Sequence, residues 1–165
     1  MIKYACVRTD NMSGTVNGKD LVSLKYEVSS KEAPIENGNI VVVGDLLTGE
    51  REVRKATAPT AAAALDTLAL VASEEVVKTK QYNTLADFRN EAGDIIRGYR
   101  LNKHDIFSVT KEALNIGESV TVAVGSIVEA MAGTKMNVVA SLTSGSTKIG
   151  KIIAIEDGWY VIEVA

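Results

Sequence analysis

The chain has 165 residues, of which 46% are hydrophobic and 24% are charged. This size and balance fit a globular domain that can bury a core without a metal ion or a disulfide. Its net charge of −3 disfavours nucleic-acid binding, because a protein that binds phosphates needs a surplus of Lys and Arg.

The N-terminal stretch, residues 1–38, is predicted to be an arm or a peripheral hairpin, with an ordinary first hairpin of the same domain as the alternative. It contains Asn17-Gly18 and a polar run from Ser29 to Pro34, both typical of turns and loops. Its only cysteine, Cys6, is expected to be a small buried hydrophobic residue on a strand. The main β-rich domain is predicted to cover residues 39–165.

Glycines divide the chain into short runs rich in Val, Ile and Thr, a pattern that predicts a mainly β fold, a small antiparallel barrel or sandwich with a few helical turns. The predicted strands are Ile2–Arg8, Leu21–Val28, Asn39–Val43, Arg51–Ala56, Thr67–Ala72, Glu75–Thr79, Ile95–Leu101, Asp105–Thr110, Ser119–Val124, Ser126–Ala130, Met136–Leu142, Lys148–Ile155 and Trp159–Val164. Short helical turns are expected after Pro59, after Thr84 and at Lys111–Leu114.

The charged run from Glu50 to Lys55 is interpreted as a solvated edge strand that is protected against unwanted pairing. The longest mostly apolar stretch, Ala58–Ala72, contains Pro59 and Asp66. It is too short and too interrupted to span a bilayer, and no leader peptide is apparent at the start of the chain. We therefore expect a soluble protein, made in a reducing cytoplasm, with no membrane partner.

Asp157-Gly158 is the strongest turn signal, because both central residues of a type I′ hairpin turn need a positive φ. A two-residue turn pairs Glu156 with Trp159 and, further along, Ile153 with Ile162. The expected core face is Ile153, Ile155, Tyr160, Ile162 and Val164. The other face, which includes Ile152, Trp159 and Val161, is apolar enough to need a partial cover, either a neighbouring sheet or a partner protein.

Candidate catalytic residues are few. His104 is expected in a surface loop without an orienting partner, and one His with one Cys cannot supply a typical zinc site. Arg97 and Arg100 are expected on opposite faces of one strand, which argues against a shared anion site, and Glu91 and Asp94 are expected to flank a turn. No catalytic residue, metal ligand or cofactor is predicted.

Three segments resemble the head-fibre and capsid decoration (cement) proteins of tailed phages: Glu36–Gly44, Thr48–Glu52 and Leu85–Arg100. The resemblance implies a non-enzymatic virion structural protein that is made in the bacterial host and binds the major capsid protein on the capsid exterior. It also implies a homo-oligomer, for which a trimer is expected, with extended termini that clasp a neighbour. The predicted protein-binding residues are Ile2, Tyr4, Trp159 and Val161.

Two other functions remain open at this stage. A carbohydrate- or cell-wall-binding β module would carry a row of exposed aromatic side chains, whereas Trp159 and Tyr160 alternate to opposite faces. A carboxylate hydrolase would need two acids facing each other across a cleft, and the 21 acidic residues do not reveal such a pair.

Overall fold

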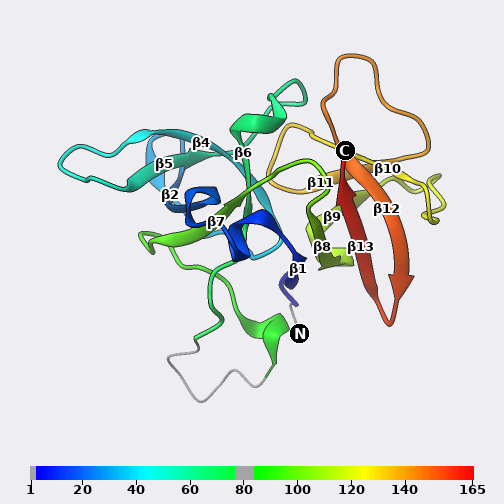
Figure 1. Ribbon diagram of the computed structural model, residues 1–165, viewed down its shortest axis with the longest axis horizontal. Coiled ribbons are helices and arrows are strands. Elements are labelled where there is room, and N and C mark those ends of the chain that lie inside the picture. The colour runs from blue at the N-terminus through cyan, green and yellow to red at the C-terminus, as the bar shows by residue number, and fades with distance from the viewer. Residues whose placement is uncertain (1–2, 77–83) are drawn as a thin grey trace.

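The computed structural model describes residues 3–76 and 84–165 and confirms the predicted mainly β fold. Figure 1 shows two curved sheets side by side, with the chain passing from one to the other several times. Within the described ranges every helical element is a three-residue 3-10 turn, and none has the length to cross a membrane. These turns are η1 (Ser13–Thr15), η2 (Gly18–Asp20), η3 (Leu65–Thr67), η4 (Leu85–Asp87) and η5 (Lys111–Ala113).

The first sheet closes into a five-stranded barrel because its end strands β2 and β7 pair with each other. The side chains of Val22, Leu24 and Tyr26 alternate along β2 and are buried, as expected for the inward face of a strand. The strands, in order around the barrel, are β2 (Leu21–Val28), β5 (Val53–Thr57), β4 (Ile40–Leu46), β6 (Leu68–Val71) and β7 (Ile96–Arg100), with the short β3 (Lys31–Glu32) attached to β2.

The second sheet is curled like half a barrel and has seven strands. Its neighbours are antiparallel except for β11 and β9, which run parallel. In spatial order the strands are β1 (Val7–Asn11), β8 (Ile106–Thr110), β13 (Trp159–Val164), β12 (Lys148–Glu156), β10 (Ile127–Glu129), β11 (Met136–Val139) and β9 (Leu114–Ile116).

Strand β6 explains how the two sheets share one molecule. Its four residues are all fully buried. Leu68 and Leu70 pack into the core beneath the second sheet, whereas Ala69 and Val71 pack into the interior of the barrel. Because both faces of β6 are covered, its sequence is a continuous apolar run rather than an alternating one.

The predicted turn at the end of the chain is confirmed. Asp157 has φ 49° and Gly158 has φ 83°, the positive values that a type I′ turn requires. Glu156 pairs with Trp159, and Ile155 with Tyr160, in the predicted register.

Beyond that point the predicted register is wrong, because Ile153 forms a β-bulge. Ala154 pairs with Val161, but the next pair is Ile152 with Ile162. The extra residue moves the side chains of β12 that precede it in the sequence to the face opposite the predicted one. Ile152 therefore lies in the core with Ile162. Ile155 keeps its predicted pairing with Tyr160, but it is 39% exposed rather than buried in the core.

The charged segment around residues 50–55 is not an edge strand, which corrects the interpretation from its composition. β5 pairs with β2 on one side and with β4 on the other. Its charges are tolerated because they lie on the outside or at the end of the barrel: Lys55 ion-pairs with Glu27 at 2.8 Å. Val53 and Ala56 are the buried residues of this strand, and Ala56 packs in the barrel core.

Two predicted strands are not formed as expected, and two short strands, β3 and β9, were missed. Residues 119–124 form turns and irregular backbone. Residues 75–76 are also irregular, and 77–79 lie outside the described ranges. β9, which follows η5 directly, was not predicted.

The two main strands of residues 1–38 lie in different sheets and do not pair with each other as a hairpin. β1 is the outermost strand of the second sheet, next to β8, whereas β2 is part of the barrel. Cys6 is buried, as predicted, but it precedes β1 rather than lying within it.

Candidate protein-binding face

The solvent side of strands β1, β8 and β13 carries a shallow hollow of about 320 Å³. In β13, Tyr160 packs against the core and Ile162 lies within it, so Trp159 and Val161 project to the other side of the sheet. We call this surface the Trp159 face; its residues are Arg8, Asp10, Ile106, Ser108, Glu156, Asp157, Trp159 and Val161.

Strand pairing places Arg8 beside Trp159. Arg8 pairs with Ser108 across β1 and β8, and Ser108 pairs with Val161 across β8 and β13. The guanidinium carbon of Arg8 lies 4.2 Å from the centre of the Trp159 ring, a cation–π contact worth about 0.5–1 kcal/mol at an exposed site. This contact holds the indole in place on a surface that is otherwise open to solvent.

A second polar contact fixes the floor of the hollow. Ser108 is 3% exposed, and its hydroxyl donates a hydrogen bond to the carboxylate of Asp10. The Trp159 face thus combines an aromatic ring, a guanidinium and a carboxylate with the apolar side chains of Ile106 and Val161. Aromatic residues and arginine are the residue types that contribute most to protein–protein binding.

The structure brings together two of the four predicted interface residues. Trp159 and Val161 share the Trp159 face. Tyr4 does not line it: its backbone N–H donates to the carbonyl of Ala86 at 2.8 Å, and its ring lies 5.3 Å from the guanidinium carbon of Arg89. Ile2 lies outside the described residues.

Arg8, Asp10 and Ile106 are members of this face that the sequence reasoning missed. The predicted first strand ended at Arg8, whereas the observed strand runs from Val7 to Asn11. The alternation of Arg8 and Asp10 was the available signal, since residues two apart on a strand share a face.

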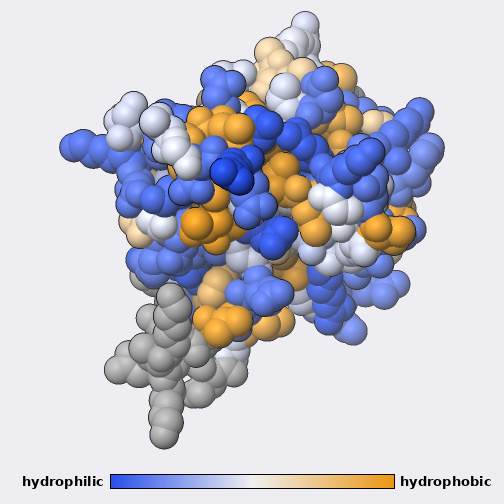
Figure 2. Space-filling view, turned by 60° about the vertical axis from the view of Figure 1, so that its left-hand side comes forward, coloured by the Kyte–Doolittle hydropathy of each residue, from blue (hydrophilic) through white to orange (hydrophobic). Residues whose placement is uncertain are grey.

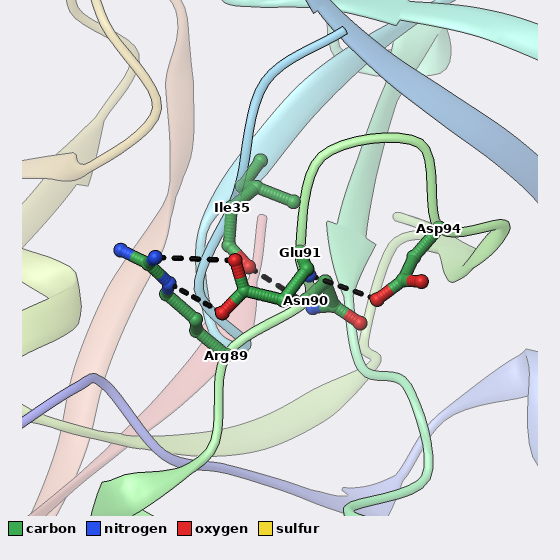
Figure 3. Close-up of polar contacts among 5 residues, drawn as sticks. All are labelled: Ile35, Arg89, Asn90, Glu91 and Asp94. Carbon is green, nitrogen blue, oxygen red and sulfur yellow. Dashed lines mark hydrogen bonds and ion pairs between the residues drawn. The ribbon is translucent and has the colours of Figure 1, made fainter.

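The turn around Glu91 and Asp94 is closed by its own acidic residues, as Figure 3 shows. The carboxylate of Asp94 accepts the backbone N–H of Glu91 at 2.8 Å, and the two carboxylate oxygens of Glu91 accept from Arg89 at 2.9 and 3.1 Å. Buried Asn90 anchors the turn to the barrel through Ile35, whose carbonyl accepts from its side-chain amide at 3.1 Å. These acids therefore have structural partners.

His104 lies in an exposed loop, as predicted. Its side chain is 74% exposed, and its Nδ1 lies 3.7 Å from Glu163. The neighbouring Asp105 is buried and does not orient it, because the carboxylate of Asp105 accepts hydrogen bonds from Ser13 at 2.8 and 2.6 Å. The geometry of a catalytic His–Asp pair is not formed here.

The most enclosed acid of the second sheet is Glu129, at 1% exposure. Its carboxylate accepts hydrogen bonds from the backbone and the hydroxyl of Thr143 and from the side chain of Asn137, each at 2.8 Å. Burial raises the pKa of Glu129, but the hydrogen bonds together lower it by more than burial raises it. The pKa of Glu129 therefore lies below its ordinary value. The ionised carboxylate of Glu129, both of whose oxygens accept hydrogen bonds, stabilises the chain around Thr143.

Within residues 3–76 and 84–165, no group of three or more His, Cys, Asp or Glu side chains is arranged to hold a metal ion. Comparison with known proteins gives no match: no family model, curated protein or solved structure is similar to this chain.

Proposed function

We propose that this chain is a non-catalytic binding protein that attaches to the outer surface of a phage capsid through its Trp159 face. The observation that carries the proposal is the Arg8–Trp159 pair, held at 4.2 Å on the solvent side of the second sheet. The pair borders a hollow in which Ile106 and Val161 lie among polar side chains. A preordered aromatic ring loses little conformational freedom on binding, which favours affinity.

The choice of partner rests on the resemblance of segments 36–44, 48–52 and 85–100 to phage head-fibre and decoration proteins. A capsid presents the same surface many times, so an oligomer with one Trp159 face on each copy gains strength from multivalency. We therefore propose a homo-oligomer, with a trimer as the expected state, whose partner is the major capsid protein.

The competing carbohydrate-binding function predicts several aromatic side chains in a row. On β13 the two aromatic residues are split between the faces, because Tyr160 packs against the core beneath the sheet. Of the described residues that line the hollow, Trp159 alone is aromatic. The surroundings of Trp159 therefore favour a protein partner.

The test is to titrate undecorated capsids with the purified protein and to measure bound protein per capsid subunit. We expect saturation at a fixed ratio, and we expect Trp159→Ala to weaken binding at least about tenfold. Leu142→Ala is the matched control, since Leu142 is an exposed apolar residue outside the Trp159 face, and it should bind like the natural protein. No saturable binding, or equal binding by Trp159→Ala, would contradict the proposal.

A further inference from the structure

The open end of the barrel contains a second hollow, of about 500 Å³. It lies where β2 and β5 begin and where β4 and β7 end. Barrel mouths are a common place for ligand sites, and this volume is in the usual range. We call it the basic hollow; its lining residues with charged side chains are Lys19, Arg51, Glu52, Arg54, Arg97 and Arg100.

The basic hollow concentrates five cations around one carboxylate, in a chain whose net charge is −3. Lys19, Arg51 and Arg97 are exposed, whereas Arg54 and Arg100 are partly buried. In the described part of the chain none of the five forms an ion pair with a carboxylate. The side chain of Arg54 donates one hydrogen bond, to the carbonyl of Gly44 at 3.2 Å, which leaves most of its donors available.

Arg97 and Arg100 both line this hollow, although the sequence pattern placed them on opposite faces of one strand and argued against a shared anion site. Arg97 is exposed and pairs with Ser23, whereas Arg100 pairs with Ala69, which lies in the barrel core. Their side chains do start from opposite sides of β7. Because Arg100 is the last residue of β7, the hollow extends around the end of the strand and reaches both.

Four of the five cations are arginines, which bind carboxylates and phosphates through paired N–H donors. Five cations gathered around a single carboxylate repel one another, and an anionic ligand relieves that repulsion. The lining also includes Leu21, Val22 and Leu46, and Leu46 is 45% exposed. Figure 2 turns the barrel side forward and shows hydrophilic and hydrophobic residues intermixed over this side of the molecule.

We propose that the basic hollow binds an acidic segment of a partner protein, in which carboxylates meet the arginines and an apolar side chain contacts Leu46. A nucleic acid fits less well, because none of the described residues that line the hollow is aromatic and could stack on bases, and the chain as a whole repels phosphates. The proposal does not depend on the capsid function, since the basic hollow and the Trp159 face share no lining residue.

The probe is a short fluorescent peptide in which Asp and Glu flank a leucine, followed by fluorescence anisotropy at low and at physiological salt. The same peptide with Lys in place of the acids is the negative control. Inorganic pyrophosphate and a single-stranded oligonucleotide are added as competitors. We expect saturable binding of the acidic peptide that weakens as salt is raised.

The decisive variant is Arg51→Glu with Arg97→Glu, since both side chains are exposed and their replacement leaves the cores intact. It should weaken peptide binding at least about tenfold. Lys103→Glu with Lys135→Glu changes the net charge by the same amount at exposed sites outside the hollow, and it should bind within about twofold of the natural protein.

Three results would overturn the proposal: no saturable peptide binding up to about 1 mM, equal weakening by the two double variants, or displacement of the peptide by less oligonucleotide than unlabelled acidic peptide. Trp159→Ala should leave peptide binding unchanged. A failure of this proposal is therefore distinguishable from a failure of capsid binding.

Discussion

Replacing Glu129 with Gln should destabilise the protein at neutral pH and have a smaller effect in acid. Glu129 is 1% exposed, and its two carboxylate oxygens accept three hydrogen bonds, one from Asn137 and two from Thr143, each at 2.8 Å. A glutamine keeps the volume but replaces one oxygen by an NH₂ group. That group then faces a donor, because both oxygens of Glu129 accept hydrogen bonds.

The magnitude follows from the lost charge-assisted hydrogen bond and from the donor left unpaired. A hydrogen bond to a charged group contributes about 1.5–3 kcal/mol, so we expect Glu129→Gln to lower the free energy of unfolding by roughly 2–3 kcal/mol at pH 7. The pKa of Glu129 in the folded chain lies below its ordinary value of 4.5. The stabilisation is therefore fully present above pH 4.5, and it is lost as the pH falls through the folded-state pKa.

Urea unfolding measures this difference, with fluorescence of the single tryptophan as the signal. Glu118→Gln is the control, because Glu118 is exposed, and it should stay within about 0.5 kcal/mol of the natural protein. The reasoning is refuted if Glu129→Gln is as stable as the natural protein at pH 7. It is equally refuted if the difference between them does not shrink at low pH.

Three further predictions concern the backbone and the thiol. Gly150→Ala should lower the free energy of unfolding by about 3 kcal/mol or more, because the added Cβ would lie 2.1 Å from the carbonyl oxygen of Glu163. Thermal unfolding measures this loss. Gly18→Ala is the control, because a Cβ at Gly18 meets no atom within 4 Å. Ser29 and Ser30 both have positive φ, 50° and 62°, which is unfavourable for serine. Replacing them with Asn-Gly should therefore raise the free energy of unfolding by about 1 kcal/mol. An unchanged midpoint of thermal unfolding would contradict backbone strain at this turn. Burial raises the pKa of the Cys6 thiol, and the negative charges of Glu75, Glu112 and Glu36 raise it further. Ellman's reagent should therefore modify Cys6 at least about 100-fold more slowly in the folded protein than in urea at neutral pH. Comparable rates would show that the thiol is accessible.

The sequence predicted the parts of the fold that depend on local chemistry. Residues Leu21–Val28 and Trp159–Val164 form strands with the predicted bounds, because alternation and glycine turns are local signals. The helical turn predicted after Thr84 is likewise local, and it forms η4. The type I′ turn at Asp157-Gly158 needs only the conformational freedom of its two residues.

The parts that depend on distant neighbours were not predictable in this way. The bulge at Ile153 leaves no mark in the residue pattern, yet it exchanges the faces of the first half of β12. The charged residues at the start of β5 are typical of an edge strand, but β5 pairs with a neighbouring strand on each side of it in the barrel. Of the candidate sites, Trp159 and Val161 followed from alternation. The approach of Arg8 to Trp159, and the hollow that Arg97 and Arg100 both line, depend on how the strands are arranged in space.

The central claim, that the Trp159 face covers a capsid surface, is tested most directly by hydroxyl-radical footprinting of the protein alone and on saturated capsids. The account predicts that oxidation of Trp159 falls sharply on the capsid, while that of exposed Leu142 stays the same. Trp159 oxidised at an equal rate in both states would contradict it.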